Sequence, residues 1–199
     1  ITLFTDRNVD RVVFGSEIPA SVFQFFNSLF IILLAPLFTY IWQTLSKKGK
    51  EPSTPMKFFL GLFQLALGFA VIALGAKYFS EDGVMPLIFL VVMYLLHTLG
   101  ELSLSPVGLS MVTKLSPKRM IGLVMGVWFL SISLANKMAG LIGSFTAQGG
   151  EDGAKLPPTE SIIVYSDTYL TWGVLVVLGA ALLLLLLTPV LRKWMHGIH

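Results

Sequence analysis

Residues 180–187 read Ala180-Ala181-Leu182-Leu183-Leu184-Leu185-Leu186-Leu187, a run that is apolar on every face. A strand of an outer-membrane barrel alternates apolar and polar side chains, so this run favours a helix surrounded by lipid. A hydrocarbon core about 30 Å thick requires roughly 20 apolar residues per helix. Segments of that length occur at 22–45, 56–77, 84–115, 120–146 and 169–191. The sequence therefore predicts an all-α membrane protein with five complete transmembrane helices.

The composition excludes the common soluble classes. Of the 199 residues, 55% are hydrophobic and 13% are charged, which is far too apolar for an ordinary soluble domain. The chain has no cysteine, so disulfides, thiolate catalysis and cysteine-ligated metals are excluded. It also has no glycine-rich phosphate loop, helical histidine pair or Ser/His/Asp grouping, so it predicts neither an enzyme nor a metal or cofactor site.

Charged residues outside the helices segregate by loop. The lysine-rich segments carry Lys47, Lys48, Lys50 and Lys57, then Lys114, Lys118 and Arg119, and finally Arg192 and Lys193. The intervening segments are mixed or acidic. The positive-inside rule then predicts a multi-pass protein of the inner (cytoplasmic) membrane with its C-terminus in the cytoplasm. The net charge of +3 reflects this topology and predicts no nucleic-acid partner, because no basic stripe with interleaved aromatic residues occurs.

The start of the chain, Ile1-Thr2-Leu3-Phe4-Thr5-Asp6-Arg7, has no initiator methionine and no signal peptide. Because five spans and a cytoplasmic C-terminus place the first loop outside, we expect residues 1–10 to be the outer end of a sixth, truncated helix. The chain is thus expected to be part of a longer protein.

The longest outside loop is expected to run from about Gln148 to Asp167. It contains Gly149-Gly150, Asp152-Gly153 and Pro157-Pro158, which are typical turn sequences, and it shows no helical periodicity. We expect this segment to be flexible and dispensable for function.

A carboxylate lies near the middle of the third predicted span. Glu101 stands in Leu99-Gly100-Glu101-Leu102-Ser103-Leu104-Ser105-Pro106-Val107-Gly108-Leu109, where a charge costs roughly 2.5 to 3.5 kcal/mol on insertion scales. Helical spacing places His97, Glu101, Ser105 and Gly108 on one polar strip. Glu101 is therefore either a functional carboxyl group or a neutral or paired one that locks the helices together.

A hinge is predicted beside this carboxyl group. Pro106 lacks an amide hydrogen and clashes with the carbonyl of the preceding turn, so the helix should kink there, and Gly100 and Gly108 lower its resistance to bending. A carboxyl group in a low-dielectric cavity, with no cation nearby, binds a proton more readily. Protonation of Glu101 can then be linked to movement of the helix.

Two further side chains stand out within the spans. Asn27 is an amide among aromatic residues, and it could hold a peptide backbone or make an interhelical hydrogen bond. Trp128 lies too deep for an interfacial belt and could form a pocket wall, although packing against lipid or another helix explains it as well.

Several of these motifs resemble one family. The runs Gly100 to Leu109, Lys114-Leu115-Ser116-Pro117 and Met125-Gly126-Val127-Trp128-Phe129-Leu130 resemble the tenth and eleventh helices of the proton-coupled oligopeptide transporters, which belong to the major facilitator superfamily. Leu3-Phe4-Thr5-Asp6-Arg7-Asn8-Val9-Asp10 resembles the outer end of their seventh helix. Ile18-Pro19-Ala20-Ser21 through Ala35-Pro36-Leu37 resembles their eighth. The resemblance covers nearly the whole chain.

The resemblance implies a fold in which two six-helix bundles enclose a central site, with this chain forming the carboxyl-terminal bundle. Residues 1–10 would end helix seven, 22–45 would be helix eight, 56–77 helix nine, 84–115 helix ten, 120–146 helix eleven and 169–191 helix twelve. Glu101 matches the glutamate near the amino group of a bound peptide, and Ser105 is its neighbour. Asn27 and Trp128 match the substrate-amide and pocket-wall positions.

The function implied by the resemblance is proton-coupled symport of di- and tripeptides by alternating access. Its partners would be a peptide, protons, the lipid bilayer and the missing amino-terminal bundle, and its energy source would be the proton gradient. Glu101 would couple the proton, and Gly100, Pro106 and Gly108 would form a hinge and gate. The alternatives are a related carrier of another small solute, such as nitrate or an amino-acid derivative, and a membrane scaffold that transports nothing.

Overall fold

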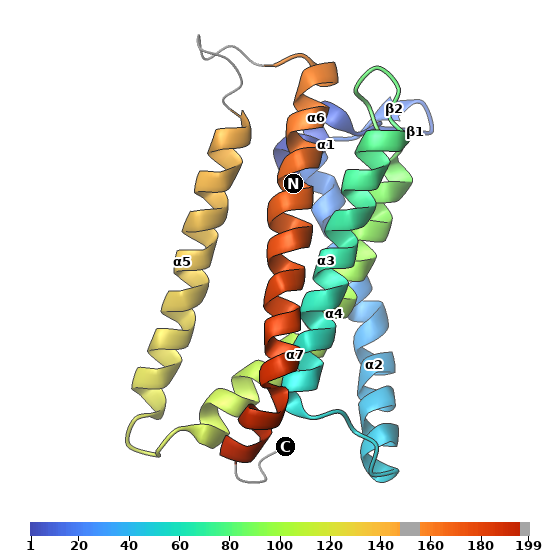
Figure 1. Cartoon of the computed structure of the whole chain (residues 1–199). Helices are drawn as coiled ribbons and strands as arrows, with labels where there is room; N and C mark the ends of the chain where they lie inside the picture. Colours follow the sequence, from blue (N-terminus) through green and yellow to red (C-terminus); the bar gives the residue numbers. More distant parts are fainter. Residues whose placement is uncertain (148–155, 196–199) are drawn as a thin grey trace.

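The computed structural model describes residues 1–147 and 156–195, and the side chains there except those of 105–107 and 145–147. Its elements are α1 (Thr2–Asn8), the strands β1 (Val12–Val13) and β2 (Ser16–Glu17), the 3-10 helix η1 (Ala20–Gln24), α2 (Phe25–Lys47), α3 (Thr54–Tyr78), α4 (Leu87–Leu115), α5 (Ile121–Ala147), α6 (Pro158–Thr168), the π-helix η2 (Tyr169–Val176) and α7 (Val177–Trp194). Figure 1 shows the long helices running roughly alongside one another, with the β1–β2 hairpin at one end.

Five helical stretches of the described chain are long and apolar enough to cross a bilayer. They are Ala20–Lys47, Thr54–Tyr78, Leu87–Leu115, Ile121–Ser144 and Pro158–Trp194. The prediction of an all-α membrane protein with five complete spans is confirmed. Prolines mark two of the helix starts, because Pro55 lies in the first turn of α3 and Pro86 directly precedes α4, where a missing amide hydrogen costs little.

The fifth span begins earlier than the sequence suggested. The expected loop up to Asp167 is wrong from Pro158 onward, because α6 starts there and continues through η2 into α7. Pro157-Pro158 is typical of a turn, but a proline at the first position of a helix is also a start signal, and Pro158 has that position here. The remainder of the expected loop, residues 148–155, lies outside the described residues. At about 1.5 Å per residue, the 37 residues of this span exceed the roughly 30 Å hydrocarbon core, so one end extends beyond it.

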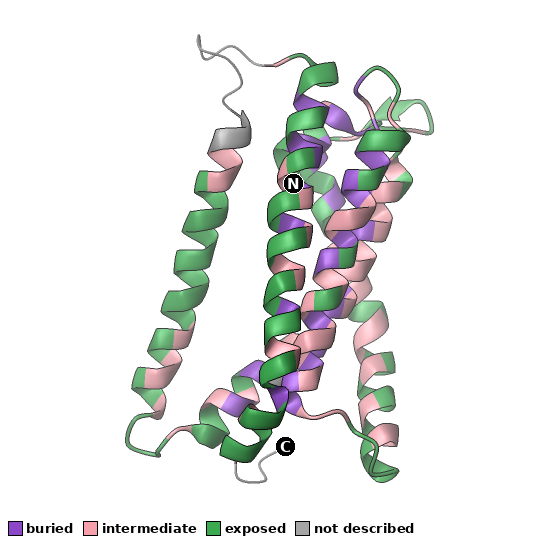
Figure 2. Ribbon diagram, in the orientation of Figure 1, coloured by how far each residue is buried: buried purple, intermediate pink, exposed green. Residues whose placement is uncertain are grey.

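The buried core lies toward one end of the molecule, where α1, α3, α4 and α6 meet. Figure 2 shows buried residues concentrated on these helices, whereas α5 is largely exposed. Phe4 is fully buried at the centre, and its ring meets those of Tyr165 and Tyr169 edge-on with centroids 5.4 Å apart in both cases. Such edge-to-face pairs stabilise beyond the area they bury. The core therefore fixes α1 against the fifth span.

Asn8 joins three segments at this end. Its side chain is fully buried; Nδ2 donates to the carbonyl oxygens of Gly83 at 2.8 Å and Pro158 at 2.9 Å, and Oδ1 accepts from the Ser161 hydroxyl at 3.1 Å. The backbone continues the contact, because the Met85 N–H donates to the Asn8 carbonyl at 2.8 Å and the Asp10 N–H donates to the Met85 carbonyl at 2.9 Å. Since the amide uses both donors and its oxygen, it links the end of α1, the α3–α4 connection and the start of α6 without an unmet polar group.

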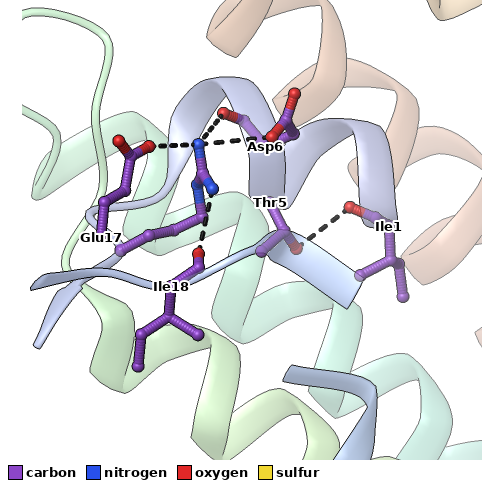
Figure 3. A network of polar contacts seen from close by, with 6 residues as sticks. Ile1, Thr5, Asp6, Glu17 and Ile18 are labelled. Atoms are coloured by element: carbon purple, nitrogen blue, oxygen red, sulfur yellow. Dashed lines mark hydrogen bonds and ion pairs between the residues drawn. The ribbon is translucent and has the colours of Figure 1, made fainter. Parts of the chain in front are cut away.

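Arg11 closes the hairpin that follows α1. Its guanidinium donates to Glu17 Oε1 at 2.6 Å, to the Ile18 carbonyl at 3.0 Å and to the Asp6 carbonyl at 3.2 Å, and it lies 3.3 Å from the Asp6 carboxylate. Figure 3 shows these groups converging on one side of the hairpin. A guanidinium can serve several acceptors at once because its five N–H groups are fixed in a plane. The network holds the approach to η1 and α2 in place.

Lys57 lies at the start of a span, as the predicted bounds 56–77 place it. It is in the first turn of α3 and is 8% exposed. Its ammonium is 2.5 Å from Glu51 Oε1 and 4.9 Å from the centre of the Trp42 ring. A buried ammonium is costly unless it is paired, and the carboxylate and the aromatic face both compensate it. The α2–α3 connection is thereby tied to both helices.

Candidate transport site

A cavity of about 1180 Å³ lies between α2, α3, α4 and α5. Its walls include Phe58 of α3 and Trp128, Phe129 and Ile132 of α5. The polar groups in its lining include Gln24, Asn27, Ser28, Tyr94, His97 and Glu101. A mostly apolar cavity with a few convergent polar groups is the usual form of a small-molecule site.

Asn27 and Glu101 come together across this cavity from α2 and α4. The Asn27 Nδ2 donates to Glu101 Oε2 at 3.4 Å, and the Asn27 Oδ1 accepts from the Thr98 hydroxyl at 2.7 Å. Thr98 is fully buried, whereas Glu101 is exposed. The carboxylate thus faces open space with an amide donor beside it, instead of being sealed in the interface between two helices.

Trp128 lines the same cavity from α5. It is half-buried, and a Cβ atom built on Gly108 would lie 3.0 Å from its Cη2 and 3.2 Å from Phe58. Gly108 therefore leaves room for the indole ring at the point where α4 meets α5. This packing duty is a reason for glycine at position 108 that is independent of the predicted hinge.

The other predicted hinge residues have separate outcomes. The side chains of Ser105 and Pro106 lie outside the described residues, so neither Ser105 as a substrate neighbour nor Pro106 as a hinge is placed by contacts. The backbone of α4 is helical through both positions. In Figure 1 the last turns of α4 run toward α5, at an angle to the first part of the helix.

Gly100 lies at the crossing of α3 and α4. A Cβ atom at this position would be 2.8 Å from the backbone oxygen of Gly61, so the two helices approach more closely than any other residue permits. Because Glu101 follows directly, this contact also sets how far the carboxylate lies from α3.

Replacing Gly100 with valine should force α3 and α4 apart. We expect the free energy of unfolding to fall by roughly 1 to 3 kcal/mol, because a backbone atom cannot move aside as a flexible side chain can. Thermal unfolding in detergent measures the effect. Gly122→Val is the matched control, since a Cβ atom there meets nothing within 4 Å. Equal midpoints for the two variants would contradict the close approach.

Sequence reasoning missed Thr98. The residue stands in the run Tyr94-Leu95-Leu96-His97-Thr98-Leu99-Gly100-Glu101, three positions before the carboxylate, and a threonine in an apolar helix commonly bonds its own backbone. Its spacing of three from Glu101 was the available signal. The sequence could not predict that Asn27 is the partner of Thr98, because the register of α2 against α4 follows from the packing of both helices.

Comparison with known proteins places the chain among transporters. The model of the POT family (PTR2) matches residues 1–159. The peptide transporter YePEPT of Yersinia enterocolitica is 44% identical over 96% of this chain and 35% of its own length. Dipeptide and tripeptide permease B of Aeromonas hydrophila is 32% identical over 99% of this chain and 39% of its own.

A solved structure extends the likeness to three dimensions. The crystal structure of a peptide transporter POT in complex with sulfate superposes with a TM-score of 0.79 at 33% identity, covering 98% of this chain and 36% of that one. The chain therefore spans between a third and two fifths of the length of these relatives, all of which are transporters and not enzymes. With most of its length matched by the family model, the chain belongs to the POT family.

Proposed function

We propose that this chain forms the carboxyl-terminal bundle of a symporter that carries di- and tripeptides with protons across the inner membrane. The observation that carries the proposal is the Asn27–Glu101 pair, which offers an amide donor and a carboxylate to the same cavity. A peptide needs both groups, because its ammonium pairs with a carboxylate and its carbonyl oxygens accept from an amide. Trp128 provides an apolar wall for side chains.

Proton coupling follows from the chemistry of Glu101. An ionised carboxylate attracts the peptide ammonium, whereas a protonated carboxyl group does not carry the charge that holds it. Protonation of Glu101 in the inward-facing state therefore weakens the hold on the peptide ammonium, so a proton that enters with the peptide promotes peptide release to the cytoplasm. Alternating access turns this linkage into net movement when peptide and proton bind one conformation better than the other.

The gate is assigned to α4. Its inner half, beyond the hinge at Pro106, moves with α5 toward or away from the opposite bundle, and Gly100 and Gly108 mark the ends of the flexible part. The change of direction along α4 in Figure 1 supports a bend in this region. The carboxyl-terminal bundle then shares the central cavity with an amino-terminal bundle, which supplies groups for the peptide carboxylate.

The orientation is assigned from charge. The α2–α3 connection, the α4–α5 connection and the end of α7 lie at one end of the molecule (Figure 1), and these are the lysine- and arginine-rich segments. The positive-inside rule places that end, with the C-terminus, in the cytoplasm. Asn8 and the hairpin then lie on the outer side.

The function is tested in proteoliposomes that contain the full-length transporter carrying this chain. Uptake of radiolabelled L-alanyl-L-alanine should exceed the external concentration when an inward proton gradient is imposed, and should only equilibrate when a protonophore removes it. An excess of unlabelled tripeptide should compete, whereas nitrate or free alanine should not. Competition by nitrate or alanine without competition by peptide would assign the cavity to another solute.

A further inference from the structure

The Thr98 hydroxyl has two acceptors within reach. Its Oγ lies 2.7 Å from Asn27 Oδ1 and 2.8 Å from the carbonyl oxygen of Tyr94, in the preceding turn of α4. One hydroxyl has one proton, so it donates to one acceptor at a time. Thr98 is fully buried, so water does not compete for that proton. The choice between the two acceptors is therefore made by what surrounds Asn27.

The choice fixes the orientation of the Asn27 amide. When Thr98 donates to Asn27 Oδ1, the amide oxygen is engaged on the side away from the cavity, and Nδ2 is left to face Glu101. The amide then presents two N–H donors, one for the carboxylate and one for a peptide carbonyl oxygen. Without the hydrogen bond from Thr98, the Asn27 amide is no longer held from behind. Its oxygen can then turn toward the cavity, where it would face an ionised Glu101 as one acceptor against another.

We propose that Thr98 is a positioning residue that holds the Asn27 amide with its NH2 group toward Glu101 and the substrate, and releases it when Glu101 is protonated. The inference deepens the proposed function and rests on it. Thr98 is not part of the cavity lining, whereas Asn27 is. Thr98 therefore acts on the substrate through Asn27.

Release follows from a second complete hydrogen-bond pattern. When Glu101 carries a proton, its O–H donates to Asn27 Oδ1, which requires the amide to turn over. Asn27 Nδ2 then donates to Thr98 Oγ, and the Thr98 proton moves to the Tyr94 carbonyl at 2.8 Å. Both patterns give the Thr98 hydroxyl and the Asn27 amide oxygen a partner, so the protonation state of Glu101 decides between them. The amide donors are thus offered to peptide while Glu101 is ionised and withdrawn when it is not.

Few other titratable groups line the cavity beside Asn27 and Glu101. Among the described residues that line the cavity, the titratable side chains are Tyr94, His97 and Glu101, all from α4. The lining side chains of α2, α3 and α5 in the described part of the chain carry no charge. His97 packs edge-on against Phe69 with ring centres 4.7 Å apart, turned toward α3. Glu101 is therefore the carboxyl group to which Asn27 responds.

The test compares Thr98→Val, which keeps the shape and removes the hydroxyl, with Thr98→Ser, which keeps the hydroxyl. In the full-length transporter we expect Thr98→Val to raise KM for L-alanyl-L-alanine by about fivefold to tenfold, as the loss of one buried hydrogen bond implies. We expect Thr98→Ser to stay within about twofold, because one hydrogen bond is retained. A purely structural defect would lower the maximal rate through lost protein and would not be rescued by serine. Equal KM values for Thr98→Val and wild type overturn the inference.

A double-mutant cycle isolates the route through Asn27. If Thr98 acts by orienting that amide, Thr98→Val has no further effect on KM in an Asn27→Ala background. Full additivity overturns the inference, because it means that Thr98 acts elsewhere. Wild-type uptake is the reference that separates the two claims. Absence of peptide uptake by wild type refutes the proposed function, whereas normal uptake with an unchanged Thr98→Val variant refutes only the role of Thr98.

A folding failure does not remove the test. Thermal unfolding of each variant is measured first, and if Thr98→Val is not recovered from the membrane, Thr98→Ala replaces it in both the comparison with serine and the cycle. The expected KM rise and its disappearance in the Asn27→Ala background are the same, because alanine also lacks the hydroxyl. A KM rise that persists in the Asn27→Ala background overturns the inference that Thr98 acts through Asn27.

Discussion

Replacing Glu101 with glutamine abolishes uphill, proton-driven peptide uptake and leaves exchange of peptide for peptide. Glutamine has the same shape and its Oε1 can still accept from Asn27 Nδ2, so the cavity should keep its form. It neither binds nor releases a proton and carries no charge for the peptide ammonium. Accumulation above the external concentration should therefore vanish, whereas binding should weaken by about tenfold through the lost charged hydrogen bond.

The measurement uses the full-length transporter in proteoliposomes under two conditions. Uptake with an imposed proton gradient reports coupling, and counterflow from peptide-loaded vesicles without a gradient reports exchange. Glu160→Gln is the matched control, because Glu160 is an exposed carboxylate in the first turn of α6, away from the cavity. It should keep both activities. Accumulation by Glu101→Gln at the wild-type level would remove this carboxyl group from the coupling step.

The sequence was most informative where a polar group sits in an apolar context. Glu101 and Asn27 stand out in the sequence because a charge or an amide inside a span is costly, and the structure brings both to one cavity with Trp128. The five spans followed from length and apolar content alone. Neither inference required knowledge of how the helices pack against one another.

What escaped prediction depends on contacts between distant segments. Thr98 becomes part of the site only because α2 lies against α4 in one register. Asn8 and Ser161 are 153 positions apart in the chain and meet only in the folded molecule. Hydropathy also does not distinguish a lipid-facing side from a bundle-facing side in helices that are apolar all round. That is why the packing role of Gly100 was invisible beside its predicted role in bending.

The helical start at Pro158 shows a different limit. Two prolines in sequence are compatible with a turn and with the first residues of a helix, and the eleven residues that follow Pro157 have a polar, mixed composition. The helix is stabilised there by tertiary contacts, since Ser161, Ile162, Tyr165 and Ser166 are buried. Local propensity cannot report burial of this kind.

Asn8→Ala should be among the most destabilising substitutions in the described outer end of the chain. The alanine leaves the carbonyl oxygens of Gly83 and Pro158 and the Ser161 hydroxyl without the amide they contact. Ser161 can still donate to the Pro158 carbonyl at 3.2 Å, so the main cost is the orphaned Gly83 carbonyl together with the lost packing. At about 1 to 3 kcal/mol per unsatisfied buried group, we expect a loss of roughly 2 to 4 kcal/mol in the free energy of unfolding.

Asn8→Asp makes the prediction sharper, because aspartate has the same shape and differs only in hydrogen bonding. The oxygen that replaces Nδ2 would face the carbonyls of both Gly83 and Pro158, placing an acceptor against two acceptors in a fully buried site, while the other oxygen still accepts from Ser161. A buried carboxylate without a cationic partner is costlier than a missing side chain. The unfolding midpoints should therefore fall in the order wild type, Asn8→Ala, Asn8→Asp, with Asn136→Ala, at an exposed position of α5, unchanged. If aspartate were as stable as asparagine at neutral pH, the two donated hydrogen bonds would not be what joins α1, the α3–α4 connection and α6.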